Sequence, residues 1–328
     1  MTTYIQPTGK ALRVSVVVIT WNRPEHVREC LTHLYQMAES PHEVLVVDAS
    51  SDSRTKAEVD AFPDARLISF PGGAGHMTRS RNKALLHVTG DVVAYLDDDA
   101  YVRPGWLAGL VQTYTESDAW AVAGRTCDQG TEKNSPGLVG LLLPSGDLTG
   151  NFHQDTEKTV DIDHGIGANM SFRREALALL GGFRDDYPGS ALREDTDIFL
   201  RLKRLGYRSV FTPRATVDHV GAPHVKGRRF DWRYQFWAHH NHVLLLCRYG
   251  GFMNRQLVGW SVRSMRRSFS MVEPGNVRSL TRPVVAVSAV ILGLVSALRS
   301  HSRDTQVVRI DAAGIRIRKA LFAGVGTR

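Results

Sequence analysis

Short runs of apolar, mostly β-branched residues alternate with helical patterns through the first part of this chain. The run Val14–Thr20 is typical of a strand buried on both faces, and Pro24 then favours the start of a helix. This strand–helix alternation predicts a mostly parallel sheet with helices on both faces, and therefore an α/β fold. Further strands are expected at 43–48, 65–70, 92–96 and 119–124, and further helices at 76–87 and 104–115.

The pattern changes twice further along the chain. After Arg125 it loosens through a stretch rich in glycine and proline to about Gly150. It then resumes with an extended segment at 162–173 and helices at 175–180 and 194–205, the second of which has a clear apolar face. Beyond His219 three helices are expected, at 230–249, 256–271 and 283–298. We therefore expect a catalytic-looking α/β body followed by a helical extension.

Charge separates the same two parts. The chain of 328 residues carries a net charge of +8, but residues 248–328 hold 14 Lys/Arg against 3 Asp/Glu, and the first 247 hold 27 against 30. A basic extension suggests an anionic partner. A membrane surface is favoured over nucleic acid because no nucleic-acid-binding motif is visible. The alternative is a subdomain that packs on the body or on a second subunit, as in a homodimer.

Two features bear on location. The helix at 283–298 is apolar for only about 16 residues, fewer than the ~20 that span a bilayer, so an interfacial or packing helix is favoured. Cys30, Cys127 and Cys247 are isolated and form no metal spacing or disulfide pattern, and no apolar signal core precedes the first strand. These features predict a cytoplasmic protein, soluble or peripheral at the inner face of the membrane.

Three consecutive aspartates, Asp97, Asp98 and Asp99, close the strand at 92–96. Side chains alternate across a strand, so Asp97 and Asp99 point to the same side and can share one cation. Mg²⁺ and Mn²⁺ prefer such oxygen ligands, and open α/β sheets bind ligands at the carboxyl ends of their strands. The alternative is a solvated acidic turn.

Four other groups can carry chemistry. Asp48 can accept hydrogen bonds from a nucleoside, or form an Asx-turn. Arg79 and Arg81 can clamp a diphosphate, or lie on a solvated basic face. The helix start at Glu194-Asp195 can supply a general base, although acids also favour first helical turns. His219 can complete a metal site with two carboxylates, although a lone histidine is more often structural.

Together these features resemble the family 2 inverting glycosyltransferases with the GT-A fold, a Rossmann-like arrangement, over roughly Val14 to His219. The matching segments are Thr20-Trp21-Asn22-Arg23, Val46-Val47-Asp48, Ser80-Arg81-Asn82, Asp97-Asp98-Asp99, Gly167-Ala168-Asn169, Gly181-Gly182-Phe183, Glu194-Asp195 and His219. The resemblance implies a GT-A catalytic domain at 1–225, with a nucleotide-sugar-binding half at about 11–125 and an acceptor-binding half at about 126–225. A basic, helix-rich region at 226–328 would follow, associating with a membrane or with a second subunit.

The resemblance also implies a role for each matching residue. Asp195 would be the catalytic base, with Glu194 beside it on the acceptor side. Asp97, Asp99 and His219 would hold Mn²⁺ or Mg²⁺. The nucleotide-sugar-binding residues would be Thr20, Asn22, Arg23, Asp48, Arg79, Arg81, Asn82, Asp97 and Asp98. The acceptor-side residues would be Gly167, Asn169, Gly182 and Phe183.

The sequence departs from the family pattern at two places. Ala49 stands where many members carry a second acid that helps to read uracil, so UDP, dTDP and GDP donors all stay open. The Gln-X-X-Arg-Trp signature of processive synthases is absent, and the nearest stretch is Arg233-Tyr234-Gln235-Phe236-Trp237. We therefore expect the addition of one sugar rather than polymerisation.

The resulting hypothesis is metal-dependent, inverting transfer of a sugar from a nucleotide-diphosphate donor to a hydroxyl group. The acceptor would be a glycan, a glycolipid, including a lipid-linked one, or a natural product. Three alternatives stay open: a retaining transferase on the same fold, a nucleotidyltransferase, and a non-catalytic protein that binds a nucleotide or lipid.

Overall fold

A nine-stranded sheet forms the centre of the body in the computed structural model, which describes residues 11–128, 137–189, 191–221, 231–252, 254–272, 276–304 and 307–323. The strand order is β3-β2-β1-β4-β8-β6-β9-β5, with β7 paired to β9. Strands β5, β7 and β8 run against the others, so the sheet is mixed and mostly parallel. The strands are β1 (Val14–Thr20), β2 (Glu43–Asp48), β3 (Ala65–Ser69), β4 (Val92–Asp97), β5 (Ala100–Val102), β6 (Ala121–Asp128), β7 (Val160–Asp161), β8 (Asn169–Arg173) and β9 (Ser209–His219).

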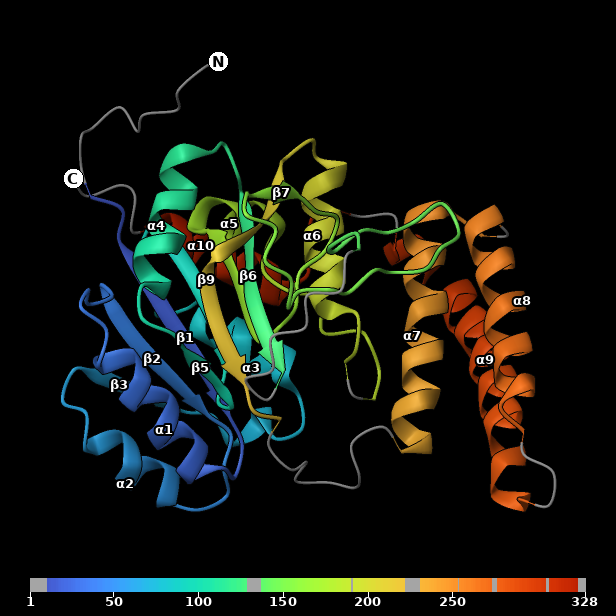
Figure 1. Ribbon diagram of the computed structural model, residues 1–328, viewed down its shortest axis with the longest axis horizontal. Helices are drawn as coiled ribbons and strands as arrows, with labels where there is room; N and C mark the ends of the chain where they lie inside the picture. Colours follow the sequence, from blue (N-terminus) through green and yellow to red (C-terminus); the bar gives the residue numbers. More distant parts are fainter. Residues whose placement is uncertain are drawn as a thin grey trace.

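Helices cover both faces of this sheet, as the α/β prediction requires (Figure 1). Successive residues of β1 face opposite sides, so Val16 and Val18 join one apolar cluster with α1 and α4, while Val17 joins the other with α5 and α6. The helices are α1 (Pro24–Tyr35), α2 (Arg54–Asp60), α3 (Met77–Ala84), α4 (Trp106–Glu116), α5 (Arg174–Leu180), α6 (Glu194–Arg204), α7 (Trp232–Gly250), α8 (Arg255–Ser270), α9 (Thr281–Asp304) and α10 (Ala312–Ala323). The predicted α/β fold with a helical extension is confirmed.

The sequence interpretation missed several elements. It did not anticipate α2, β5 or α10, and it ended β6 at Gly124 although the strand runs to Asp128. The extended segment expected at 162–173 is a strand only at Asn169–Arg173. The start expected for the first tail helix, at residue 230, lies outside the described residues, and α7 is described from Trp232.

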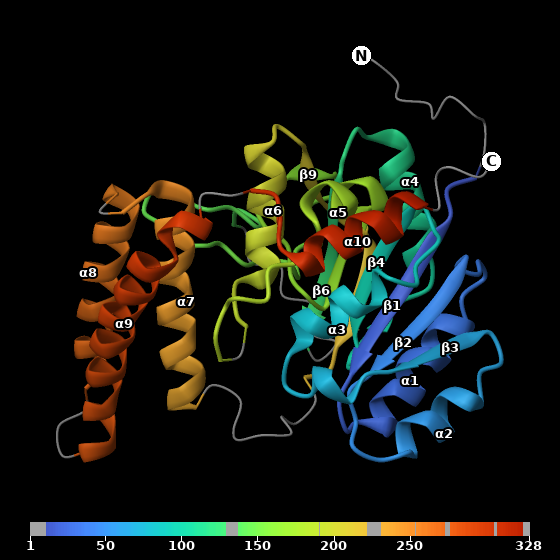
Figure 2. The same cartoon turned by 180° about the vertical axis from the view of Figure 1, so that it is seen from behind.

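The three long helices α7, α8 and α9 stand together beside the body (Figure 1). The chain then returns, and α10 lies across the body against α5 (Figure 2). Ile317 and Leu321 of α10 are buried in the same apolar cluster as Val17 and Phe199. The end of the chain therefore packs with the sheet although it follows the helical extension in sequence.

Candidate active site

Three potential metal ligands meet at the carboxyl end of β4. One ligand atom each from Asp97, Asp99 and His219 lies within 4.8 Å of the others. The short strand β5 explains the meeting, because its antiparallel pairing with β9 places Ala100 opposite His219. The residue before Ala100 is Asp99, and its Oδ1 lies 3.4 Å from His219 Nε2. The expectation that Asp97 and Asp99 can face one cation agrees with this geometry.

His219 is held from its other side by an acid that the sequence interpretation missed. Its Nδ1 lies 3.0 Å from Oδ1 of Asp128, and the two residues are neighbours in the parallel β6–β9 register. Burial opposes protonation of the imidazole, but hydrogen bonds to Asp99 and Asp128 and the charges of Asp99 and Asp97 outweigh it and raise the pKa of His219 to about 9. Asp128 therefore orients the ring and leaves Nε2 toward Asp99.

These residues fit a hard divalent cation. Two carboxylates and one imidazole are a donor set that Mn²⁺ accepts, and carboxylates also suit Mg²⁺. A carboxylate behind a ligating histidine is a common supporting arrangement in metal sites. Burial raises the pKa of Asp97, and the negative charge of Asp99 adds to the effect while Arg81 opposes it. Carboxylates destabilised by burial and by one another are suited to neutralisation by a cation.

Asp98 lies in the same turn but is turned into the protein. Its side chain is buried and accepts hydrogen bonds from Thr20 Oγ1 at 2.7 Å and from Arg23 Nη1 at 3.0 Å. Burial raises the pKa of Asp98 to about 7, while Arg23 opposes the shift. Of the residues expected at the nucleotide, Asp98, Thr20 and Arg23 thus engage one another and tie β1 to β4. Arg23 also lies 3.7 Å from Asp99 Oδ2.

Arg81 connects the aspartate turn to the start of α6. Its guanidinium is 1% exposed, and it pairs with Asp97 at 3.3 Å and with Glu194 through Nη1. Burial opposes the charge on Arg81, but Glu194, Asp97 and Asp195 together raise its pKa. An added Cβ at Gly167 would lie 2.6 Å from Arg81 Nη2, so any other residue at position 167 would displace this guanidinium. Residues far apart in sequence therefore share one buried charge network.

Glu194 and Asp195 occupy different environments at the start of α6. Glu194 is buried, and burial raises its pKa to about 7, with Arg81 opposing and Asp195 adding to the shift. Asp195 is partly exposed, and its Oδ1 accepts a hydrogen bond from the backbone N–H of Thr196 at 2.7 Å. Asp195 is thus the carboxylate that remains accessible, beside a buried partner that faces Arg81.

The carboxyl ends of β1 and β2 form the neighbouring part of the same edge. Asp48 pairs in register with Thr20, and its Oδ1 accepts from the N–H of Ser50 at 2.8 Å, the Asx-turn contact. Asn22 has a left-handed φ of 55° and accepts from the N–H of Ser51 at 3.1 Å. The turns after β1 and β2 therefore hold each other.

Several expected site residues are engaged elsewhere. Arg79 pairs with Asp185 at 3.6 Å, at a half-exposed position away from the partners of Arg81. Asn82 exchanges two hydrogen bonds of 2.8 Å with the backbone of Phe183, and a Cβ at Gly182 would meet its Oδ1 at 2.5 Å. Asn169 is buried among the carbonyls of Arg125 and Ala215 and the indole N–H of Trp106. In this structure these contacts join elements of the body to one another.

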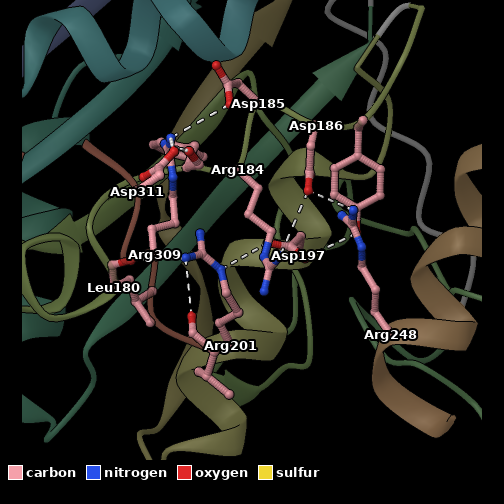
Figure 3. Close-up of polar contacts among 12 residues, drawn as sticks. Leu180, Arg184, Asp185, Asp186, Asp197, Arg201, Arg248, Arg309 and Asp311 are labelled. Atoms are coloured by element: carbon pink, nitrogen blue, oxygen red, sulfur yellow. Dashed lines mark hydrogen bonds and ion pairs between the residues drawn. The ribbon is translucent and has the colours of Figure 1, made fainter. Parts of the chain in front are cut away.

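A buried ionic cluster fixes α6 from its other side (Figure 3). Asp197 is fully buried and accepts from Arg201 Nε at 2.9 Å and from the hydroxyls of Tyr187 and Tyr249. Although burial acts to raise it, the pKa of Asp197 is lowered by Arg201, Arg184 and Arg248. The cluster joins α6 to α7 and to the returning chain, where Arg309 bonds the carbonyl of Phe183. Further ion pairs extend the cluster: Asp186 pairs with Arg248 at 2.9 Å, and Asp185 and Asp311 pair with Arg309.

Arg193 and His164 are further residues that the sequence interpretation missed. Arg193 immediately precedes Glu194, has a left-handed φ of 84°, and donates from Nε to His242 Nδ1 at 3.1 Å. His164 is buried, and its Nε2 lies 2.9 Å from the carbonyl oxygen of Thr149. Strained non-glycine backbone is concentrated at functional sites, but a φ angle has no signal in a single sequence.

Comparison with known proteins decides the family. The model of glycosyl transferase family 2 matches residues 15–181, just over half of the chain. The chain belongs to this family. It is therefore a glycosyltransferase, and the family resemblance drawn from the sequence motifs is confirmed.

Three curated relatives of this family 2 transferase are 27–28% identical to it over the aligned residues. An N-acetylglucosaminyl-diphospho-decaprenol L-rhamnosyltransferase of Mycobacterium tuberculosis is 28% identical over 83% of this chain and 97% of its own length. A glucosyl-dolichyl phosphate glucuronosyltransferase of Haloferax volcanii is 27% identical over 69% of this chain and 72% of its own. A succinoglycan biosynthesis protein of Rhizobium meliloti is 28% identical over 64% of this chain and 67% of its own.

Solved structures confirm the GT-A type of fold. The mannosyltransferase of Pyrobaculum calidifontis in complex with GDP-Man and Mn²⁺ has a TM-score of 0.54 at 18% identity, over 97% of this chain and 87% of that chain. TarS of S. aureus has a TM-score of 0.57 at 13% identity, over 97% and 93%. At these identities the likeness concerns the fold alone.

Proposed function

We propose that this family 2 transferase moves one sugar from a nucleotide-diphosphate donor to a hydroxyl acceptor, with inversion and with a divalent cation. The observation that supports the proposal most is the position of Arg81, which contacts both Asp97 and Glu194. This residue joins the candidate metal ligands to the candidate base motif, so both lie at one site. The Mn²⁺ complex of the structurally similar mannosyltransferase supports the same class of donor and cation.

The side chains divide the chemistry between them. Asp97, Asp99 and His219 would hold Mn²⁺ or Mg²⁺, which supplies Lewis-acid stabilisation of the charge on the leaving diphosphate. Asp195 takes the proton from the acceptor hydroxyl as the hydroxyl oxygen forms a bond to C1 of the sugar. The bond from C1 to the diphosphate oxygen breaks on the opposite face. Arg81 keeps Glu194 paired, so that Asp195 is the carboxylate left to act as the base.

For the acceptor we propose a sugar carried on a polyprenyl phosphate or diphosphate. Two of the relatives are named for acceptors of this kind, a diphospho-decaprenol and a dolichyl phosphate. The enzyme would then work at the inner face of the cell membrane as a peripheral protein. Donors carrying uridine, thymidine or guanosine diphosphate all stay within the proposal.

Replacing the base tests the reaction. Asp195→Asn keeps the size of the side chain but removes its basicity, so turnover should fall by about 10²- to 10⁴-fold while donor affinity stays within about twofold. Turnover is followed by nucleotide release, and donor affinity by calorimetry in the presence of Mn²⁺. Asp161→Asn is the matched control, since Asp161 pairs with Arg208 on the surface. Near-normal turnover by Asp195→Asn would disprove its role as the base.

The stereochemistry separates the proposal from its nearest alternative. A retaining transferase on the same fold would not need Asp195 as a base and would keep the anomeric configuration of the donor. NMR of the product formed from an anomerically pure donor distinguishes the two. A product of unchanged configuration would contradict the inverting mechanism.

A further inference from the structure

The α8–α9 pair presents a wide apolar surface that nothing else in the described chain covers. More than half of the exposed large apolar side chains among the described residues lie between Val258 and Leu298. Val258, Val262 and Phe269 recur at helical spacing on one side of α8, and Val284, Ile291 and Leu298 do so on α9. Exposed apolar side chains gathered in this way mark an interaction site, because soluble proteins seldom leave them open. We call this surface the hairpin face. It consists of Val258, Val262, Phe269, Met271, Leu280, Val284, Ile291, Leu292 and Leu298.

The hairpin face includes the outer side of α9, the one helix of the described residues that is long and apolar enough to cross a membrane by length and composition. Its apolar stretch Thr281–Arg299 has a mean hydropathy of 1.9 and is 33% buried, so it is not a core helix. The inner side of α9 packs on α7, where a Cβ at Gly293 would meet the carbonyl of His240 at 2.9 Å. His240 Nε2 also lies 2.9 Å from Ser296 Oγ. With one side packed on protein, α9 offers only its other side to a partner.

The charged side chains next to the hairpin face are all arginines in the described residues 254–272 and 276–299. Arg266, Arg267, Arg282 and Arg299 are exposed beside the apolar residues, and residues 254–272 and 276–299 contain no Asp or Glu. A second copy of this chain docked through the same face would bring arginine against arginine, since a two-fold interface pairs identical surfaces. An anionic lipid surface matches both properties, because it accepts apolar side chains between its head groups and attracts arginines.

Other side chains of α8 attach the hairpin to the rest of the protein. Arg263 points inward and pairs with Asp147 at 3.1 Å, and Trp260 packs on the His242 ring at 4.3 Å. Both residues attach α8 to the body. The carboxyl end of α8 and the amino end of α9 lie at the same end of the molecule as the carboxyl ends of β1 and β9, where the active site lies (Figures 1 and 2).

We infer that the hairpin face docks the enzyme on an anionic bilayer. The biological role of this docking rests on the proposed function, in which the acceptor is lipid-linked. Its physical basis, apolar and arginine side chains on one surface, is independent of the reaction.

Vesicle binding by the full-length protein without substrates tests the inference. Vesicles of phosphatidylcholine mixed with phosphatidylglycerol should bind the protein. Vesicles of phosphatidylcholine alone should bind it much less, and high salt should weaken its binding to the mixed vesicles. Phe269→Ser and Ile291→Ser should each weaken binding about tenfold. The double variant Arg266→Gln/Arg267→Gln should weaken it by about fivefold for each arginine.

Two matched controls lie on α10, away from the hairpin. Phe322→Ser and Ile315→Ser remove exposed side chains of the same types, which are 51% and 43% exposed, and should leave vesicle binding unchanged. Equal binding by the hairpin and control variants would overturn the inference. So would a dimer in solution that Phe269→Ser dissociates, because the hairpin face would then join two copies. Turnover with a water-soluble acceptor should stay normal in Phe269→Ser, so a failure of docking is distinct from a failure of the proposed reaction.

Discussion

Arg81 is a buried cation, and its position requires that residue 167 is a glycine without a side chain. It is 1% exposed and bonds the carbonyl of Gly167 as well as its two acids. A planar guanidinium can contact two carboxylates at fixed angles, which a lysine ammonium does not reproduce. Any group that displaced it would leave Glu194 buried without its partner, and an unpaired buried charge is costly.

Gly167→Ala should therefore reduce activity more than a single methyl group suggests. The new Cβ would crowd Arg81 at 2.6 Å and shift it from Asp97 and Glu194. Overpacking of this kind costs about 1–3 kcal/mol of stability, and turnover should fall at least about tenfold. Gly150→Ala is the control, because no heavy atom lies within 4 Å of its added Cβ. Assays of turnover and thermal unfolding check both variants, and full activity in Gly167→Ala would show that Arg81 can move without consequence.

The sequence could predict that Asp97 and Asp99 lie together, but not the contacts of every polar residue near them. Alternation along a strand and the parallel topology are enough to bring Asp97 and Asp99 together. No such rule distinguishes Asp98, which Thr20 and Arg23 hold inside the protein, from an exposed ligand. The same limit applies to Asn169, whose three partners come from distant segments. Long-range hydrogen bonds depend on packing that local patterns do not contain.

At the scale of elements, α6 uses its helical period to present two different surfaces. Asp195 is partly exposed toward the site, whereas Asp197 lies two positions later on the opposite side and is fully buried. Arg201, one turn after Asp197, closes the contact along the same side. The buried pair therefore sets the orientation of the turn that carries the proposed base.

Asp197 should make the stability of the protein depend on pH. Its folded pKa is lowered, so near pH 4 the unfolded chain takes up a proton that the folded chain does not. The stabilisation is thus complete above about pH 5 and is lost as pH falls through the lower folded pKa. Asp197→Asn should cost about 3–5 kcal/mol at neutral pH, and this difference should shrink in acid. Urea unfolding of both proteins between pH 7 and pH 3 measures it, and a difference independent of pH would contradict the argument.

Elements with strong periodic patterns were predictable, and short or late ones were not. The buried strands β1 and β2 have the bounds that the sequence predicts. β5 has three residues and exists because it pairs with β9, a contact across more than a hundred residues. α2 was hidden because its seven residues follow a polar turn and bury only Thr55 and Val59. Tertiary contacts, rather than local propensity, decide such elements.

At the scale of the whole molecule, the chain attaches its helical extension at both ends. α7 begins soon after β9, and the segment after α9 returns to the body, where the N–H of Arg309 donates to the carbonyl of Leu180. Arg201 also donates to the carbonyl of Val307 across this junction. The boundary expected at residue 225 places α10 with the hairpin in one basic, helix-rich region. Ile317 and Leu321 of α10 are nevertheless buried in the apolar cluster of the body.

Removal of residues 305–328 should therefore destabilise the catalytic body, not only the tail. Ile317 and Leu321 are 3% and 1% exposed, and the body would lose their burial. At about 1.5–3 kcal/mol for each side chain, the free energy of unfolding should fall by roughly 3–6 kcal/mol. Ile317→Ser should reproduce part of the loss, whereas Ile315→Ser, at a 43% exposed position, should stay within about 0.5 kcal/mol. Urea unfolding of the three proteins gives these values. If the truncated protein unfolds like the full chain, α10 is a passive tail and the extension is attached at one end only.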